Sequence, residues 1–279
     1  MTQKTQIDDF SHIALTYIAT FYFDQKNYGS LTDLLHCYST YPDFILDRLQ
    51  FVFVDDGSAV DVAIPDDLDL NVLMLKIQDN IPWNQPGARN LGVMYARSDK
   101  IILTDVDHMF PSHTMERMIR HRNPGKNVYK FRLVIEEDGS SHKAHPNSFF
   151  MSRARFLRHY GYDEDFCGHY GFDDSMMWRW QRYHGTRFLY FRSKYHCMHR
   201  NIDRDRSYHS LSRELEHNRN VADEKRAAWA KYGPNAGHSR RFLNFKWDIV
   251  LDRRRSRRPE PRKNTLWTKT WQLRQLLPF

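Results

Sequence analysis

The chain has 279 residues, 41% hydrophobic and 14% aromatic, enough to bury the core of one large globular domain or of a domain with an appendage. No apolar run approaches the roughly 20 residues that cross a bilayer, and the N-terminal residues do not resemble a secretory signal. Cys37, Cys167 and Cys197 form no CxxC pair, which indicates reduced thiols rather than a disulfide framework. The expected location is therefore cytoplasmic.

The formal net charge of +8 is concentrated at the C-terminus. Residues 240–279 contain 12 Lys or Arg and 3 Asp or Glu, so the rest of the chain is nearly neutral. Within this region, 253–263 is too polar to form core, and 267–279 mixes Trp and Leu with cations. Such a tail suits the inner face of an anionic membrane, where each basic residue contributes about 1 kcal/mol. A solvated tail and nucleic-acid binding are the alternatives.

Strand-like and helix-like segments alternate through the first half of the chain. The apolar runs predict strands at 13–21, 49–58, 71–77 and 100–104, and helical spacing predicts helices at 30–41 and 87–98. Continuous apolar runs are typical of parallel strands that are covered on both faces. The pattern favours an α/β fold with a Rossmann-like, mostly parallel sheet flanked by helices.

The pattern is less regular after residue 111. We expect strands at 131–141, 147–153 and 188–192, and helices at 153–161, 173–185 and 210–233. Gly185 and the Gly233-Pro234 pair are helix-stop signals for the last two helices. The C-terminal region is therefore expected to be a helical, basic extension.

Acidic residues follow two of the predicted strands. Asp55 and Asp56 end one apolar run, and Asp105 and Asp107 end another. Ligands of parallel sheets bind beyond the carboxyl ends of the strands, so these acids are expected at one rim. In extended backbone, residues i and i+2 point the same way, and two such carboxylates suit Mg²⁺ or Mn²⁺. A solvated turn is the alternative for an isolated pair.

The chain contains four segments of interest, which are VDDGS at 54–58, GARNLGVMYARSDKIILTDVDHMF at 87–110, GYDEDFCGHYGFDD at 161–174 and HCMHR at 196–200. In this order they resemble segments of glycosyltransferase family 2 and the related β-1,4-galactosyltransferases, which have the GT-A fold. The resemblance covers about residues 13–200. It implies, in turn, a nucleotide-binding motif, a helix leading into a DxD strand, an acceptor-side loop and a histidine that binds the metal.

This resemblance implies roles for the acids at the rim. Asp55 or Asp56 would contact the base and ribose of a nucleotide-sugar, and Arg89 would face the uracil or the diphosphate. Asp105 would lie near the ribose and the metal ion, and Asp107 would bind that ion. Mn²⁺ or Mg²⁺ would act as a Lewis acid on the departing nucleoside diphosphate.

His199 matches the family's metal-binding histidine more closely than His196 does. Both, with Cys197, also admit a zinc site, but a closed structural zinc site needs four ligands. His108 is a weaker candidate ligand, because its side chain should point away from Asp107 if the strand continues.

The resemblance also assigns the acceptor side of the site. Asp174 matches the catalytic base that takes the proton of the acceptor hydroxyl in an inverting transfer, and Asp173 is its neighbour. The following sequence departs from the family pattern, so the two can exchange roles, and a pair of first-turn helix acids is the structural alternative. The predicted acceptor-binding residues are Tyr170, Phe172 and Trp178.

The expected architecture is a GT-A catalytic domain at 1–209 and an extension at 210–279. The nucleotide-sugar half is about 13–110 and the acceptor half about 111–209. The expected function is metal-dependent, inverting transfer from a UDP-sugar to a glycan or lipid-linked saccharide. A nucleotidyltransferase would need a Gly-rich loop near the first strand, where only Gly29 occurs. Nucleic-acid binding would leave the clustered acids without a role, so nucleic acid is not an expected partner.

Overall fold

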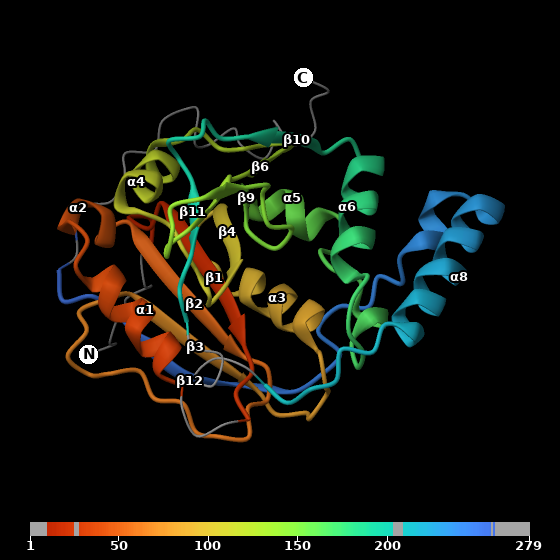
Figure 1. Ribbon diagram of the computed structural model, residues 1–279, viewed down its shortest axis with the longest axis horizontal. Helices are drawn as coiled ribbons and strands as arrows, with labels where there is room; N and C mark the ends of the chain where they lie inside the picture. The colour runs from red at the N-terminus through yellow and green to blue at the C-terminus, as the bar shows by residue number, and fades with distance from the viewer. Residues whose placement is uncertain (1–9, 25–27, 203–208, 258, 260–279) are drawn as a thin grey trace, which may run out of the picture.

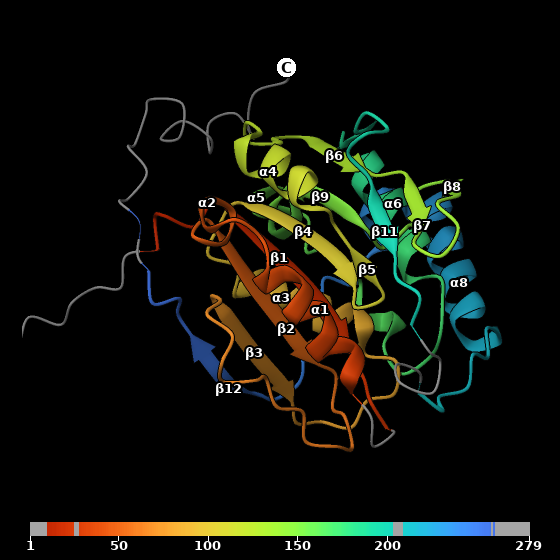
Figure 2. The ribbon, with the colours of Figure 1, turned by 60° about the vertical axis from the view of Figure 1, so that its left-hand side comes forward.

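The computed structural model describes residues 10–24, 28–202, 209–257 and 259 (Figures 1 and 2). Within these residues the longer strands are β1 Leu15–Phe21, β2 Leu49–Asp55, β3 Val72–Ile77, β4 Lys100–Asp105, β6 Asn127–Lys130, β9 Phe149–Ser152, β10 Arg187–Tyr190 and β12 Trp247–Arg253. They form one sheet in the order β10-β6-β9-β4-β1-β2-β3-β12. Four short strands, β5 His108–Met109, β7 Leu133–Ile135, β8 Ser141–His142 and β11 Cys197–His199, form a second sheet in the order β5-β11-β7-β8.

The helices cover both faces of the large sheet. The α-helices are α1 Gly29–Ser39, α2 Asp43–Leu46, α3 Gln85–Met94, α4 Ser112–Arg120, α5 Arg153–Arg158, α6 Asp173–Tyr183 and α8 Glu216–Tyr232, and the 3₁₀ turns are η1 Glu164–Phe166 and η2 Pro234–Gly237. Along β2, Phe51 and Phe53 belong to the core beneath α1, whereas Val52 and Val54 belong to the core beneath α3. Figure 2 shows these two helices on opposite sides of the strands.

The parallel centre of the sheet agrees with the sequence prediction. β1 pairs in parallel with β2 and β4, and β2 pairs in parallel with β3. The predicted strand 131–141 is instead two strands, β7 and β8, because the intervening residues turn back at Gly139 (φ 69°). Helix α4 and strand β6 were not predicted, and residues 210–215 precede the helix that was predicted to begin there.

The C-terminal region is not helical throughout. Strand β12 pairs antiparallel with β3 and extends the edge of the main sheet. Just beyond it Arg255, only 7% exposed, forms ion pairs with Asp43, Asp47 and Asp69. The expectation that 253–263 cannot pack is therefore wrong at Arg255, because three carboxylates compensate its buried charge. The tail residues 260–279, on which the membrane prediction rests, lie outside the described residues.

No helix among the described residues is long and apolar enough to cross a bilayer. The predicted domain boundary near residue 209 stays a prediction. Strand β12, which follows this boundary, belongs to the same sheet as the strands that precede it.

Replacing Arg255 with Met should lower the free energy of unfolding by about 3 kcal/mol, because breaking a buried ion pair leaves a buried charge poorly compensated. Asp47, the partner that would lose this cation, has a side chain that is only 4% exposed and would keep only the more exposed Arg257 as a partner. Urea unfolding followed by Trp fluorescence gives the value. Arg257→Met is the matched control, because the Arg257 side chain is 58% exposed and pairs with the same Asp43 and Asp47. A loss no greater than that of the control would contradict the structural role of Arg255.

Candidate active site

The carboxyl end of β4 brings the two DxD carboxylates into a cleft. Asp105 is the last residue of β4, and the chain then turns at Val106 and Asp107 before β5 begins. Because the strand breaks there, His108 does not point away from its neighbour: its Nδ1 lies 3.4 Å from Asp107 Oδ1. The expectation for His108 applied to a continuing strand, and because that condition is not met its ring belongs to the same cluster as the carboxylates.

The small sheet places a second histidine beside Asp107. The antiparallel register of β5 and β11 pairs His199 with His108, and His199 Nδ1 lies 3.9 Å from Asp107 Oδ2. The ligand atoms of Asp107, His108 and His199 all lie within 4.8 Å of one another. The sequence favoured His199 over His196 as a metal ligand. The structure is consistent with this choice, since the ring of His196 packs against His113 instead.

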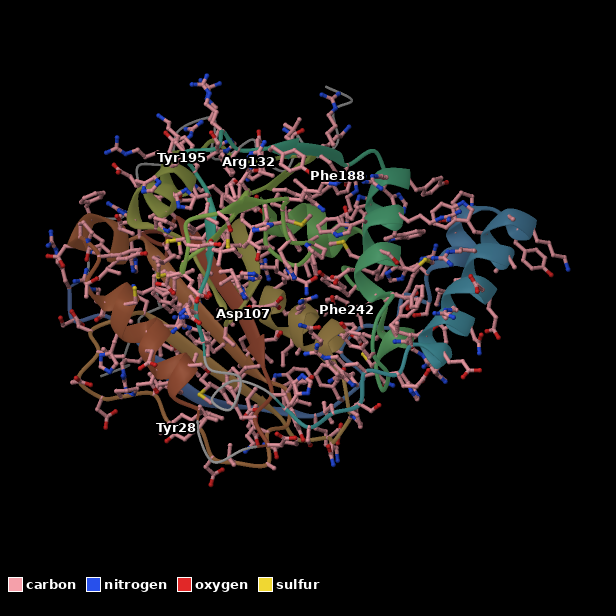
Figure 3. The ribbon with its side chains drawn as sticks, viewed as in Figure 1. Tyr28, Asp107, Arg132, Phe188, Tyr195 and Phe242 are labelled. Carbon is pink, nitrogen blue, oxygen red and sulfur yellow. The ribbon has the colours of Figure 1, made fainter. Side chains whose placement is uncertain are left out.

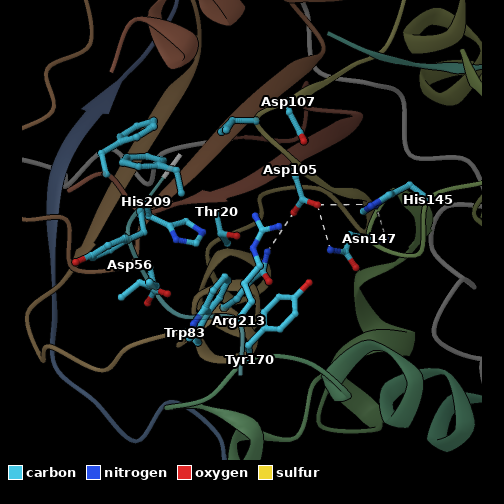
Figure 4. A pocket seen from close by; sticks show the side chains of 16 residues that line it. Thr20, Asp56, Trp83, Asp105, Asp107, His145, Asn147, Tyr170, His209 and Arg213 are labelled. Carbon is cyan, nitrogen blue, oxygen red and sulfur yellow. Dashed lines mark hydrogen bonds and ion pairs between the residues drawn. The ribbon is translucent and has the colours of Figure 1, made fainter. Parts of the chain in front are cut away.

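A second group of ligand atoms within 4.8 Å consists of Asp105, His108 and His145. His145 was not predicted, because it lies in a loop before β9 that carries no recognisable motif. Its ring packs against that of His108 at an interplanar angle of 54°, with centroids 4.7 Å apart, and its Nδ1 is 3.9 Å from Asp105 Oδ2 (Figure 4).

The donor atoms at Asp107 fit a divalent cation. Asp107 Oδ1 and His199 Nδ1 are buried atoms that have no hydrogen-bond partner among the described residues. A carboxylate combined with imidazole suits Mn²⁺ better than Mg²⁺, which prefers oxygen ligands alone. Among the described residues, His196 and Cys197 belong to no such group, so the zinc alternative has no support there.

Arg89 lies beneath the rim and joins the two halves of the site. Its guanidinium, on α3, is 2.8 Å from Asp105, 3.1 Å from Asp174 and 3.8 Å from Asp173. The side chain is only 1% exposed, and the predicted contact of Arg89 with a nucleotide stays a prediction. Its positive charge compensates three carboxylates, which would otherwise repel one another in this buried place.

The residue after Arg89 fixes the acceptor-side loop. Asn90 donates a hydrogen bond from Nδ2 to the carbonyl of Tyr162 at 2.9 Å, and its Oδ1 accepts one from the Tyr162 amide at 2.9 Å. The Tyr162 hydroxyl in turn donates to Asp174 Oδ1 at 3.1 Å. Adjacent residues of α3 thus position both a carboxylate and the backbone that leads to it.

Asp173 and Asp174 begin α6 after two residues with left-handed backbone, Gly171 (φ 91°) and Phe172 (φ 66°). Burial and the adjacent Asp174 raise the pKa of Asp173 to about 7. Burial also raises the pKa of Asp174, although Arg89 opposes this rise. Both groups therefore hold a proton more readily than ordinary carboxyls do.

The two carboxylates of the VDDGS segment, Asp55 and Asp56, lie in different surroundings. Asp55 is fully buried and accepts a hydrogen bond from the amide of Ser58 at 2.7 Å, so it closes the turn after β2. Asp56 instead lines the cleft beside the DxD residues, and its Oδ1 has no hydrogen-bond partner among the described residues. Of the two candidates for contacting a nucleotide, Asp56 is the one that faces the cleft.

Two clefts meet at the rim. One, of about 330 Å³, includes Asp56, Asp105 and Asp107, and the other, of about 560 Å³, includes Asp173 and Asp174. They share the lining residues Trp83, Gln85, Asn147 and Tyr170. In Figure 4, Trp83, His209 and Arg213 lie across the first cleft from Asp107.

The predicted acceptor residues differ in exposure. Tyr170 lines both clefts and packs against Trp83 in a tilted arrangement, with ring centroids 4.6 Å apart. Phe172 and Trp178 line the second cleft. Trp178 is mostly core, because it is 6% exposed and packs edge-on against Phe149.

The family described as Glycosyl transferase family 2 matches residues 28–198. The chain belongs to this family. The protein is therefore a glycosyltransferase family 2 enzyme. No curated protein is significantly similar to it in sequence.

Solved structures show the same fold. The glycosyltransferase is similar to residues 1–349 of S. aureus TarS, with a TM-score of 0.51 and 14% identity over 67% of this chain and 60% of that one. TarS 1–349 in complex with UDP-GlcNAc gives 0.52 and 13% identity over 81% and 68%. A Drosophila β-1,4-galactosyltransferase 7 mutant in complex with manganese, UDP-Gal and xylobiose gives 0.47 and 12% identity over 74% and 80%. The two TarS likenesses, which have TM-scores above 0.5, confirm an α/β GT-A-like fold.

The titration of the DxD pair predicts how the affinity of this candidate site for Mn²⁺ would depend on pH. Burial and the neighbouring Asp105 raise the pKa of Asp107 to about 6. Burial opposes ionisation of Asp105 as well, but Arg89 and the histidines hold its pKa below the ordinary value. Only deprotonated Asp107 binds a cation, so affinity for Mn²⁺ should be constant above pH 7 and fall about tenfold per pH unit below the pKa.

Electron paramagnetic resonance of free Mn²⁺ between pH 5 and 8 measures this affinity. Asp107→Asn should weaken binding and make the acid limb less steep, because one ligand that competes for protons is lost. Asp61→Asn is the control, because the Asp61 side chain is fully exposed on another loop. An acid limb of unchanged steepness in Asp107→Asn would assign the titration to another group.

Proposed function

We propose that the protein is a metal-dependent, inverting glycosyltransferase that uses a UDP-sugar and a saccharide acceptor. The observation that supports this most is the convergence of three acidic sets on adjoining clefts. Asp56 faces the donor cleft, Asp107 with His199 forms the candidate metal site, and the pair at the start of α6 lines the acceptor cleft. Glycan and lipid-linked saccharide acceptors are both compatible with this arrangement.

The donor cleft supports recognition of a uracil. The unpartnered Oδ1 of Asp56 can accept the N3–H of uracil, whereas cytosine has no hydrogen at that nitrogen. The rings of Tyr22 and Trp83 line the same cleft and offer faces on which a base can stack. We therefore assign base recognition to Asp56, and structural support of the turn to Asp55.

Asp107 and His199 would hold the divalent ion. When bound, Mn²⁺ would supply Lewis-acid stabilisation of the departing nucleoside diphosphate. Asp105 has a different part, because its Oδ1 accepts from Arg89 at 2.8 Å and its Oδ2 from Asn147 at 3.1 Å. It is thus a fixed negative charge beside the metal site rather than a free ligand.

Asp174 is the proposed base. Its Oδ1 is held by Arg89 and Tyr162, each at 3.1 Å, which orients the side chain and leaves Oδ2 for the acceptor hydroxyl. The side chain is 24% exposed, compared with 12% for Asp173. Its raised pKa brings a carboxylate closer to the basicity that proton transfer from a hydroxyl requires.

Asp107→Ala should abolish Mn²⁺-dependent release of nucleotide, because it removes the carboxylate from the candidate metal site. The measurement is nucleotide release from a panel of UDP-, GDP- and CMP-sugars with Mn²⁺, with and without chelator. Release from UDP-sugars alone is the expected result. The Asp61→Asn protein is the control for expression and folding, and far-UV circular dichroism should be unchanged. Activity of Asp107→Ala within a few-fold of wild type would rule out the metal assignment.

Asp174→Asn should reduce transfer to an acceptor by about 10²- to 10⁴-fold while donor binding is retained, since a positioned base is worth that much. Transfer by the unsubstituted protein should fall as pH drops below the raised pKa of this carboxyl, because only the deprotonated form accepts the proton. Asp173→Asn is the paired variant. The opposite pattern, with the larger loss in Asp173→Asn, would move the base by one residue.

A further inference from the structure

A third cleft, of about 450 Å³, lies away from the catalytic acids. It is formed where the end of α4 meets β6 and the connection from β10 to β11. Its lining combines three cations with several aromatic rings, among them Arg117, Arg192, Lys194, Tyr129, Tyr190 and Tyr195. We call it the basic aromatic pocket.

The charge in this pocket is uncompensated. No Asp or Glu lines it, and within the described part of the chain Arg117, Arg192 and Lys194 form no ion pair. The nearest acid along α4, Glu116, is paired with Arg120. Burial lowers the pKa of His121 in the pocket, and the charge of Arg117 lowers it further, which is consistent with a positive local field.

The aromatic rings give the pocket a flat, apolar wall. Tyr129 and Phe191 stack with centroids 4.9 Å apart, and the Tyr195 ring lies 5.0 Å from Lys194 Nζ. Tyr190 is 64% exposed at the mouth of the cleft. Such faces suit the C–H surface of a sugar ring, and the cations beside them suit its anionic substituents.

The pocket lies close to the candidate metal site along the chain. Tyr195 precedes β11 and His199 ends it, so these two residues are at most about 14 Å apart at their Cα atoms. Figure 3 shows Tyr195 near the upper edge of the molecule and Asp107 below it. Arg132 adds a cation at the same end, since the register of β7 and β11 places Leu133 opposite Cys197.

We propose that the basic aromatic pocket binds an anionic saccharide unit of the acceptor while another unit of the same chain occupies the catalytic clefts. The acceptor would then be an oligosaccharide or polysaccharide with carboxylate or phosphate groups. This inference rests on the proposed function. A lipid surface fits less well, because the cations surround a concavity, and nucleic acid fits less well in a family that transfers sugars.

The test compares two soluble hexasaccharides of equal length, a hyaluronan fragment that carries carboxylates and neutral chitohexaose. Calorimetric titrations use the full chain, saturated with UDP and Mn²⁺ so that the donor cleft is occupied. The hyaluronan fragment should bind at least about tenfold more tightly than chitohexaose, and its affinity should fall with salt. Equal affinity for the two, or no binding of either, would overturn the proposal.

The matched variants replace two cations each. Arg192→Glu with Lys194→Glu should weaken hyaluronan binding at least about tenfold. Arg219→Glu with Lys231→Glu makes the same charge change at exposed positions of α8 and should leave the affinity within about twofold. The milder pair Arg192→Gln with Lys194→Gln should give an intermediate loss. Similar losses in the pocket and α8 variants would overturn the proposal, because they would show a general charge effect.

Two further probes separate other ligands. Tighter binding of single-stranded oligothymidylate than of hyaluronan, lost in the Arg192 and Lys194 variants, would overturn the saccharide assignment. Loss of binding to vesicles of acidic phospholipid in the same variants, without loss of hyaluronan binding, would also overturn the saccharide assignment. Hydrolysis of the donor without acceptor should be unchanged in all variants, and it reports independently on the proposed function. Its absence from wild type would refute that function, and hexasaccharide binding would still decide the pocket.

Discussion

The buried guanidinium of Arg89 is the interaction on which the candidate site depends. Three carboxylates from two distant segments approach a single cation that is almost wholly removed from solvent. Without it, burial would drive these acids toward their neutral forms, and their mutual repulsion would separate β4 from α6. The helix that carries Arg89 is itself packed against β1 and β2, so the core of the sheet fixes the position of the charge.

This arrangement gives neighbouring carboxylates different properties. Asp105, in direct contact with the guanidinium, has a lowered pKa, whereas Asp107, two residues later, has a raised one. A structural charge and a titratable candidate metal ligand thus come from one short motif. The same separation occurs in VDDGS, where Asp55 is used by the backbone and Asp56 faces the cleft. In both motifs the contact made by one acid leaves the other available for a ligand.

The sequence predicted those features of the structure that depend on a residue and its neighbours along the chain. The apolar runs predicted β1 to β4 because those strands are buried on both faces, and the ordered motifs predicted the family. His145 was missed because its importance comes from the antiparallel return of β9 beside β4, which no local pattern encodes. The ion pairs of Arg89 were not predicted for a related reason. Its partners at the start of α6 are about 85 residues away, as the Arg89–Asp174 hydrogen bond records.

The C-terminal strand was missed because its composition is mixed. Strand β12 contains Asp248, Asp252 and Arg253, and most of its residues are exposed or half-buried, so it carries little of the apolar signal that marks a central strand. Its stability comes instead from backbone pairing with β3 and from charge pairs such as Arg97 with Asp252. Charge along an edge strand also protects it from pairing with other molecules.

Strand β12 also sets the order in which the sheet can be completed as the chain is made. The hydrogen bond from Gln78 to Asp248 spans 170 residues of sequence, and the ladder beside it is equally non-local. Until β12 has left the ribosome, one edge of the apolar strand β3 has no partner and is open to pairing with other nascent chains. Closing so long a loop is also slow. Pairing of β12 with β3 is therefore a late step of folding. It replaces the unpaired edge of β3 by an edge whose charged residues disfavour pairing with further strands.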